Sequence, residues 1–252
     1  MIKFFRKIRQ KLLSENKFSK YLIYAIGEII LVVIGILIAL QVNNQNQVEN
    51  EKKALKNYLE KIAINVKGDI KVAETMIETR TQQSLLCAEA TELISKKDWN
   101  DQRKITNAVF AMIIEQPLNF NRSGFESLKN SGYLQHLDNP KVEELIYNYY
   151  NAVDKVIFEE SSLQVWANDL DLELHKSGFF SEWIELEKRP NQKLNEVIGN
   201  YTDELCDHKG NDMVLSLLYR GFLFTADLTN FYNEQLTYGN KLLLSIENYD
   251  KK

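Results

Sequence analysis

Proline, cysteine and histidine are scarce in this chain of 252 residues. It has three prolines, two cysteines and three histidines, and no glycine-rich phosphate loop, G-x-S-x-G elbow or C-x-x-C pair. The missing motifs argue against the common nucleotide-binding, hydrolase and thiol-redox sites. Few prolines and few alternating β-branched runs favour helices over strands. We therefore predict an all-α protein without enzymatic activity, cofactor or metal.

The histidines lack the spacing of bundle metal sites. Asp171 and Glu204 precede His175 and His208 by four residues. Carboxylate-bridged metal sites in helical bundles instead use Glu-x-x-His, with a spacing of three. We interpret both pairs as exposed contacts between successive helical turns.

The two cysteines leave two interpretations open. Cys87 follows Leu85-Leu86, an apolar neighbourhood typical of a buried free thiol. An oxidising compartment would also permit a disulfide with Cys206, whose formation depends on the distance between the two Cα atoms.

The one long apolar run covers residues 22–40, LIYAIGEIILVVIGILIAL, and contains one charge, Glu28. A helix needs about 20 apolar residues to cross about 30 Å of hydrocarbon. With its shoulders the run extends over residues 21–42, where we predict a single transmembrane helix. A cleaved signal peptide is the rival interpretation. It requires a shorter apolar core and a small-x-small cleavage site, whereas this core ends in Ala39-Leu40-Gln41.

The charges on the two sides of this run differ strongly. Residues 1–20 carry seven bases and one acid, and after Val42 no base occurs before Lys52. This asymmetry predicts a cytoplasmic N-terminus and places residues 43–252 outside. The basic segment 1–20 is also amphipathic, so membrane lipid is an expected partner. Residues 43–252 have 24 bases and 33 acids, a charge of −9 that argues against binding nucleic acid.

One face of the predicted membrane helix combines a polar residue with small residues. Glu28, Val32, Gly35 and Ala39 recur at spacings of four, three and four. Small residues four apart let a second helix approach closely. We predict helix association through this face, with a second copy or a membrane protein as partner, and chance occurrence of the motif as the alternative.

Residues 43–252 form a domain in which apolar residues recur at spacings of three and four. This pattern predicts long helices over residues 48–96 and 212–248, a further helix over 191–207, and an elongated bundle. In the last long helix the apolar positions include Phe222. The strongest periodic stretch runs from an expected start at Asn139-Pro140 to a stop at Gly178, and only Glu160 breaks it.

Shorter signals predict local structure between these helices. Asp101 is an expected N-cap of a helix that ends before Pro117. Ser123 and Glu126 have the spacing of a capping box, and Gly132 suits the left-handed position after a helix end. Five aromatic residues gather after residue 146, and core packing is favoured over a ligand pocket for them. They are Tyr147, Tyr149, Tyr150, Phe158 and Trp166.

Two blocks carry a resemblance to a known family. The start, MIKFFRKIRQKLLSENKFSKYLIYAIGEIILVVIGILIALQVNN, resembles the shared start of uncharacterised single-pass membrane-anchored proteins of the Bacteroidetes group, a domain of unknown function. The segment GFESLKNSGYLQHLDNPKVEELIYNYY is similar to that family's second common block. The resemblance implies a Gram-negative inner membrane and hence a periplasmic domain. It implies no activity and no catalytic residues.

Three functions are compatible with these features. The first is a non-enzymatic scaffold or accessory subunit acting through helix–helix association. The second is a periplasmic ligand-sensing bundle that signals through a partner, since the cytoplasmic part contains only about 20 residues. The third is a proton-coupled, stator-like subunit that uses Glu28.

Overall fold

The computed structural model describes residues 18–114, 118–183 and 201–249, and every regular element among them is a helix. The all-α prediction is confirmed. The chain divides into two compact units, Met1–Leu55 and Lys56–Lys252. Helix α2, Phe18–Lys96, contributes residues to both.

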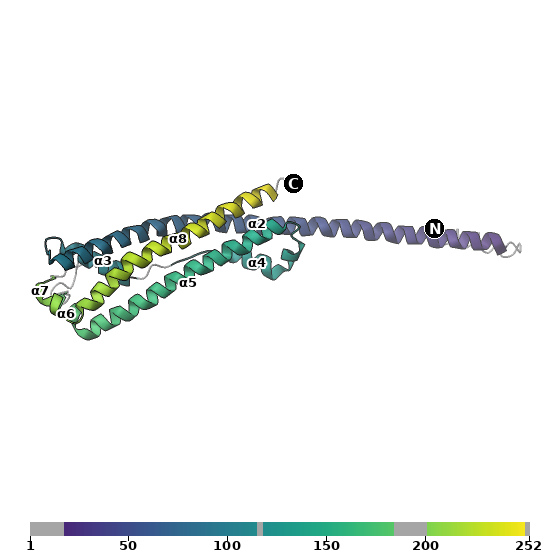
Figure 1. Ribbon diagram of the computed structural model, residues 1–252. Coiled ribbons are helices and arrows are strands. Elements are labelled where there is room, and N and C mark those ends of the chain that lie inside the picture. Colours follow the sequence, from purple (N-terminus) through teal and green to yellow (C-terminus); the bar gives the residue numbers. More distant parts are fainter. Residues whose placement is uncertain (1–17, 115–117, 184–200, 250–252) are drawn as a thin grey trace, which may run out of the picture. The chain divides into compact units, whose positions relative to one another are not determined.

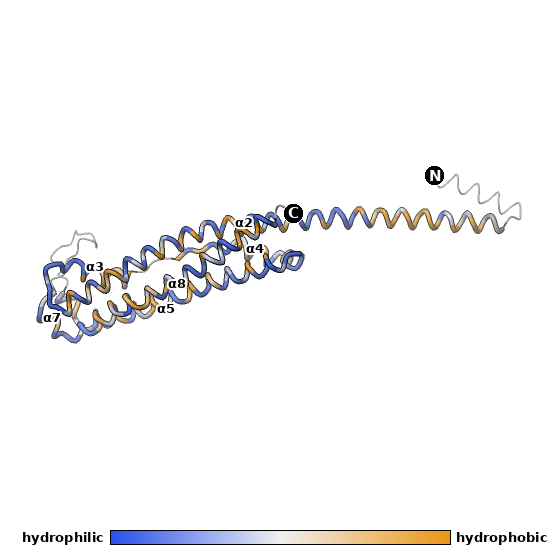
Figure 2. Tube along the Cα trace, turned by 45° about the horizontal axis from the view of Figure 1, so that its top comes forward, coloured by the Kyte–Doolittle hydropathy of each residue, from blue (hydrophilic) through white to orange (hydrophobic). Residues whose placement is uncertain are grey.

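The first unit contains the apolar run. Within the described residues one helix is long and apolar enough to cross a membrane, and its most apolar 18-residue window has a mean hydropathy of 2.7. None of that window is buried within the protein. In Figure 2 this part of α2 is coloured mostly as hydrophobic.

The second unit is a helical bundle in which α5, Pro140–Ser177, runs antiparallel to α8, Asn211–Tyr249. Helices of 38 and 39 residues reach about 57 Å at 1.5 Å per residue. Residues 56–96 of α2 and α3, Gln102–Ile113, pack beside them (Figure 1). The elements α4, Ser123–Ser131, and η1, Tyr133–His136, precede α5, whereas α6, Phe179–Trp183, and α7, Asp203–Asp207, precede α8.

The helix ends follow the local sequence in most places. The Asn139 side chain accepts a hydrogen bond from the Val142 amide, with Pro140 in the first turn, and Gly178 ends α5 at φ 80°. Gly132 has φ 77° after α4. These three predictions are confirmed. After α2 the reversal occurs at Lys97, a non-glycine residue with φ 53°, where the Asp98 amide donates to the Leu93 carbonyl.

At two predicted helix starts, Ser123 and Asp101, the expected side-chain capping hydrogen bond is absent. Helix α4 begins at Ser123 itself after an Arg122 cap without a side-chain hydrogen bond, so no capping box forms with Glu126. The Asn121 side chain accepts from the Ser123 amide instead, two residues on. Asp101 does precede α3, but its side chain makes no capping hydrogen bond.

Two further predictions are corrected in the region of α7 and α8. Of the predicted helix 191–207, residues 191–200 lie outside the described part, and only Asp203–Asp207 is helical in the rest. Phe222, predicted at an apolar seam position, is 43% exposed. Its neighbour Gly221 faces the core instead, where a Cβ atom would lie 2.6 Å from the Cys87 sulfur and 2.6 Å from the Met112 sulfur.

The largest hydrophobic cluster of the bundle gathers residues from α2, α3, α5, α6, α7 and α8. Its bulkiest members lie in and around the short helices that precede α8. They are Phe179, Phe180, Trp183 and Tyr201. The aromatic rings pack on one another, with Trp183 and Tyr201 edge to face at 5.5 Å. This end of the bundle is therefore held by large aromatic contacts.

Candidate functional site

The predicted association face lies on the exposed part of α2. Val32 is 56% exposed, and no atom lies within 4 Å of the position that a Cβ would take on Gly35. Ala39 is exposed and Glu28 is half-buried. The four residues share one side of the helix because their spacing matches 3.6 residues per turn. Helix association through this side stays a prediction.

A buried ion pair lies in the middle of the bundle. The Arg80 guanidinium of α2 and the Glu160 carboxylate of α5 form a two-pronged salt bridge, with side chains that are 5% and 6% exposed. Glu160 is the residue that breaks the apolar periodicity of α5. The break therefore marks a position where a charge is buried against a partner of opposite charge.

Two neighbours complete the contacts of this pair. The Tyr232 hydroxyl of α8 donates to Glu160 at 2.6 Å, and Arg80 donates to the Gln83 side chain at 2.5 Å. Gln83 in turn donates to the Ala111 carbonyl of α3 at 2.5 Å. Burial and the Glu160 carboxylate raise the pKa of Tyr232, so its hydroxyl keeps its proton. Four helices thus meet through one hydrogen-bonded network, which defines their register.

A second polar contact holds α4 against α2. Asp69, 2% exposed, accepts from the Asn121 amide at 2.8 Å and from the Tyr149 hydroxyl at 3.0 Å. One turn earlier, Asn65 accepts from the Gly124 amide at 2.8 Å. One amide just before α4 and one in its first turn thus find acceptors on α2.

Gly124 permits this close approach. A Cβ atom there would lie 2.8 Å from the Asn65 side-chain oxygen and 2.9 Å from the Ile62 backbone nitrogen. Burial raises the pKa of Asp69, while its two hydrogen bonds lower it in part. The residues Gly68-Asp69, which interrupt the apolar pattern of α2, therefore lie at a docking point and not at a break in the helix.

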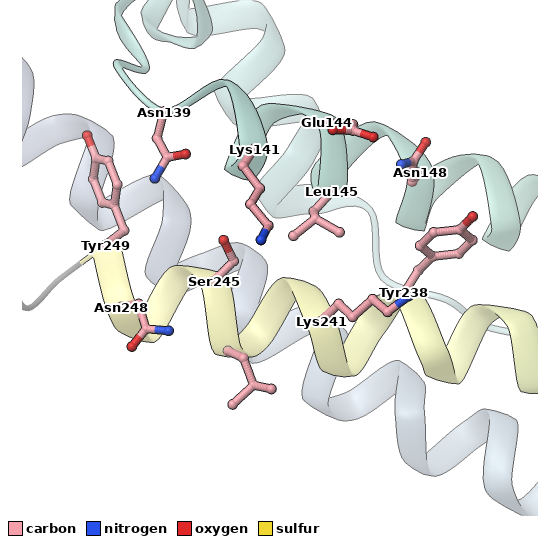
Figure 3. A pocket seen from close by; sticks show the side chains of 11 residues that line it. Asn139, Lys141, Glu144, Leu145, Asn148, Tyr238, Lys241, Ser245, Asn248 and Tyr249 are labelled. Atoms are coloured by element: carbon pink, nitrogen blue, oxygen red, sulfur yellow. The ribbon is translucent and has the colours of Figure 1, made fainter.

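An open groove of 720 Å³ lies between the first turns of α5 and the last turns of α8. Figure 3 shows Lys141 extending from α5 toward α8, and Lys241 lying along α8 beside Tyr238. Leu145 lies between the two helices on the α5 side. The sequence gives no sign of this groove, because its lining residues come from segments about 100 positions apart.

The two carboxylate–histidine pairs, interpreted from the sequence as exposed contacts, have different outcomes. His175 is exposed and lies 3.4 Å from Asp171, as expected for residues one turn apart. His208 follows the end of α7 and lies 3.9 Å from Glu182 instead of pairing with Glu204. No group of three or more metal-ligating side chains occurs within the ranges that the structure describes.

Both cysteines are free thiols. Cys87 is fully buried in the main core, and burial raises its pKa to about 12, so it is a poor nucleophile. Cys206 is half-buried, and burial raises its pKa as well. The disulfide interpretation is therefore wrong for this structure.

The five aromatic residues divide between core and surface. Tyr149 and Tyr150 are buried, and Tyr150 stacks on Phe125 at 4.3 Å between ring centroids. Phe158 is 66% exposed, and Trp166 lies against the Arg220 guanidinium at 4.9 Å. These residues line no common pocket in the described part of the chain. Core packing accounts for Tyr149 and Tyr150 and in part for Trp166, which packs against the main hydrophobic cluster.

Sequence reasoning missed the Arg80–Glu160 contact, although a signal was present. Arg80 and Gln83 fall on the same periodic series as the buried Ala73, Met76 and Cys87 of α2. A charged residue at a seam position of each of two helices, with opposite signs, predicts a buried pair.

Neither the protein-family models, nor the curated proteins, nor the solved structures with which the chain was compared match it.

Proposed function

We propose that this is a non-enzymatic, membrane-anchored protein that acts as a scaffold or accessory subunit through helix–helix association. Residues 21–42 cross a Gram-negative inner membrane once, with residues 1–20 in the cytoplasm and residues 43–252 in the periplasm. The seven bases before the span support this orientation. The compartment rests on the family resemblance of the two sequence blocks.

One observation carries the proposal. No residue of the apolar window is buried, no atom lies within 4 Å of the position that a Cβ would take on Gly35, and Ala39 is exposed. Lipid can cover the apolar surface, but small residues four apart leave a shallow strip that a helix fills better than lipid chains do. The partner is a second copy of this helix or the helix of another membrane protein.

The test uses tagged full-length protein purified from native membranes in mild detergent. Complex mass and co-purifying proteins are measured together for the wild type, Gly35→Ile and Gly27→Ile. Gly27 is a matched control, because it also has nothing within 4 Å of its Cβ position. It precedes Glu28 by one residue and so points about 100° away around the helix.

The expected result is a defined complex for the wild type and Gly27→Ile, and its loss for Gly35→Ile. A bulky side chain at Gly35 would separate the helices at their closest point. A wild type that stays monomeric and partnerless would overturn the proposal. Equal loss in both variants would show that association does not use this face.

A further inference from the structure

The groove between α5 and α8 has an unusual charge for this protein. Residues 43–252 carry a formal charge of −9. The groove is nevertheless lined by two lysines, Lys141 of α5 and Lys241 of α8, and by one carboxylate, Glu144. Its local charge is therefore opposite in sign to that of the domain.

The two ammonium groups have no carboxylate partner among the described residues: every ion pair found there joins other side chains. Lys241 lies 5.7 Å from the centroid of the Tyr238 ring, and Lys141 stands in the first turn of α5. The N-terminal end of a helix carries partial positive charge, so a lysine there is unfavourable without an anion. Two unpaired cations facing one groove also repel each other, and an anion between them would remove both costs.

The rest of the lining is suited to hydroxyl groups. Asn148, Ser245 and Asn248 supply amide and hydroxyl groups, and Leu145 supplies an apolar wall. At the end of the groove the Tyr249 hydroxyl donates to Asp138 at 3.0 Å. A volume of 720 Å³ lies within the range of small-ligand sites.

We propose that this groove binds a phosphate ester whose organic part carries hydroxyl groups. Lys141 and Lys241 hold the phosphate from two sides, and the side chains of Asn148 and Ser245 hydrogen-bond the hydroxyl groups. The ligand is either a soluble phosphate ester or the headgroup of a phospholipid such as phosphatidylglycerol. The lipid source depends on the proposed membrane anchor, whereas the soluble source does not.

The experiment uses the full chain in two arms. In mild detergent, glycerol 3-phosphate is titrated by calorimetry at constant ionic strength, with glycerol as the uncharged control. In nanodiscs, thermal unfolding is compared between phosphatidylglycerol and phosphatidylcholine. Each arm compares the wild type with K141Q/K241Q and with the matched control K67Q/K71Q, which removes two exposed lysines of α2 outside the groove.

The proposal is supported if K141Q/K241Q weakens binding in either arm by about tenfold or more while K67Q/K71Q leaves it within about twofold, because the double variant removes two charge-assisted hydrogen bonds to the phosphate. A response to glycerol 3-phosphate alone identifies a soluble ligand. A response to phosphatidylglycerol alone identifies a lipid headgroup. No response in both arms, or equal weakening by the two double variants, overturns the proposal. The association test at Gly35 is read separately, so the two proposals fail independently.

Discussion

The two parts of helix α2 share one backbone geometry but differ in which side chains they bury and which they expose. Residues 22–42 expose apolar side chains on all sides, whereas residues 56–96 bury polar ones, including Asn65, Asp69, Arg80 and Gln83. In Figure 2 the first part is mostly hydrophobic, whereas hydrophilic and hydrophobic residues alternate along the second. The same helical hydrogen bonds serve both parts. The comparison teaches that the surroundings, and not the helix, decide which side chains are tolerated.

Burial of charge differs between the two parts as well. Arg80 and Glu160 neutralise each other's charge. Arg80 also donates to the Gln83 side chain, and Glu160 also accepts from the Tyr232 hydroxyl. A bilayer supplies no such groups, so a charge at its centre is costly. The following predictions test this difference in order of expected effect.

The largest effect is expected from breaking the buried pair on one side. Arg80→Met leaves the Glu160 carboxylate buried without its cation and should lower the free energy of unfolding by about 3–5 kcal/mol. Urea unfolding of the full-length protein in mild detergent, followed by circular dichroism, measures the loss. The double variant Arg80→Met/Glu160→Leu removes both charges and should recover most of it. A double variant as unstable as the single one would contradict this account.

A charge in the apolar part should have a somewhat smaller effect, on membrane insertion. Leu31, 72% exposed, lies near the centre of the run. Leu31→Arg should make insertion less favourable by about 2.5–3.5 kcal/mol, because a charged side chain near the bilayer centre is costly. The fraction of protein that resists alkaline extraction from membranes measures it, with Leu31→Ile as the control. Unchanged extraction by the arginine variant would argue against a membrane-spanning role.

Two glycines in the bundle should respond in opposite directions to the same change. Gly124→Ala places a methyl group 2.9 Å from the Ile62 backbone nitrogen, and should destabilise by about 1–3 kcal/mol. Gly68→Ala meets no atom within 4 Å and should stabilise α2 by up to about 1 kcal/mol. Thermal unfolding of both variants tests this, and equal behaviour would refute the close approach of α4 to α2.

The smallest effect is a dependence on pH at Asp69. Burial raises its pKa above 3.8 in the folded protein, so the folded state binds the proton more tightly than the unfolded state. Stability from this group therefore falls as pH rises from about 3.8 through the raised pKa. Asp69→Asn cannot titrate, so the stability of the wild type relative to this variant should decrease over that window. A relative stability that increases with pH would reverse the assigned sign.

The helices themselves were largely predictable, because their signals are local. Asn139-Pro140 and Gly178 delimit α5, and the end of α2 at Lys96 follows from the loss of periodicity. The capping box at Ser123 failed because the Ser123 hydroxyl donates to the Asn65 side chain, nearly 60 residues away, a partner that a local motif cannot reveal. The prediction that Phe222 is buried failed because Gly221, which packs closely against Cys87 and Met112, faces the core in its place.

The sequence alone determined the fold class, the apolar run and the charge asymmetry around it, since each depends on composition and on spacing along one helix. Only the tertiary structure decided the partners of the buried charges, the docking of α4 and the groove between Lys141 and Lys241. The physical reason is that hydrogen bonds and ion pairs depend on distances of a few ångströms between residues about 50 to 100 positions apart. Periodicity identifies which side of a helix is buried, but packing determines which polar group meets another there.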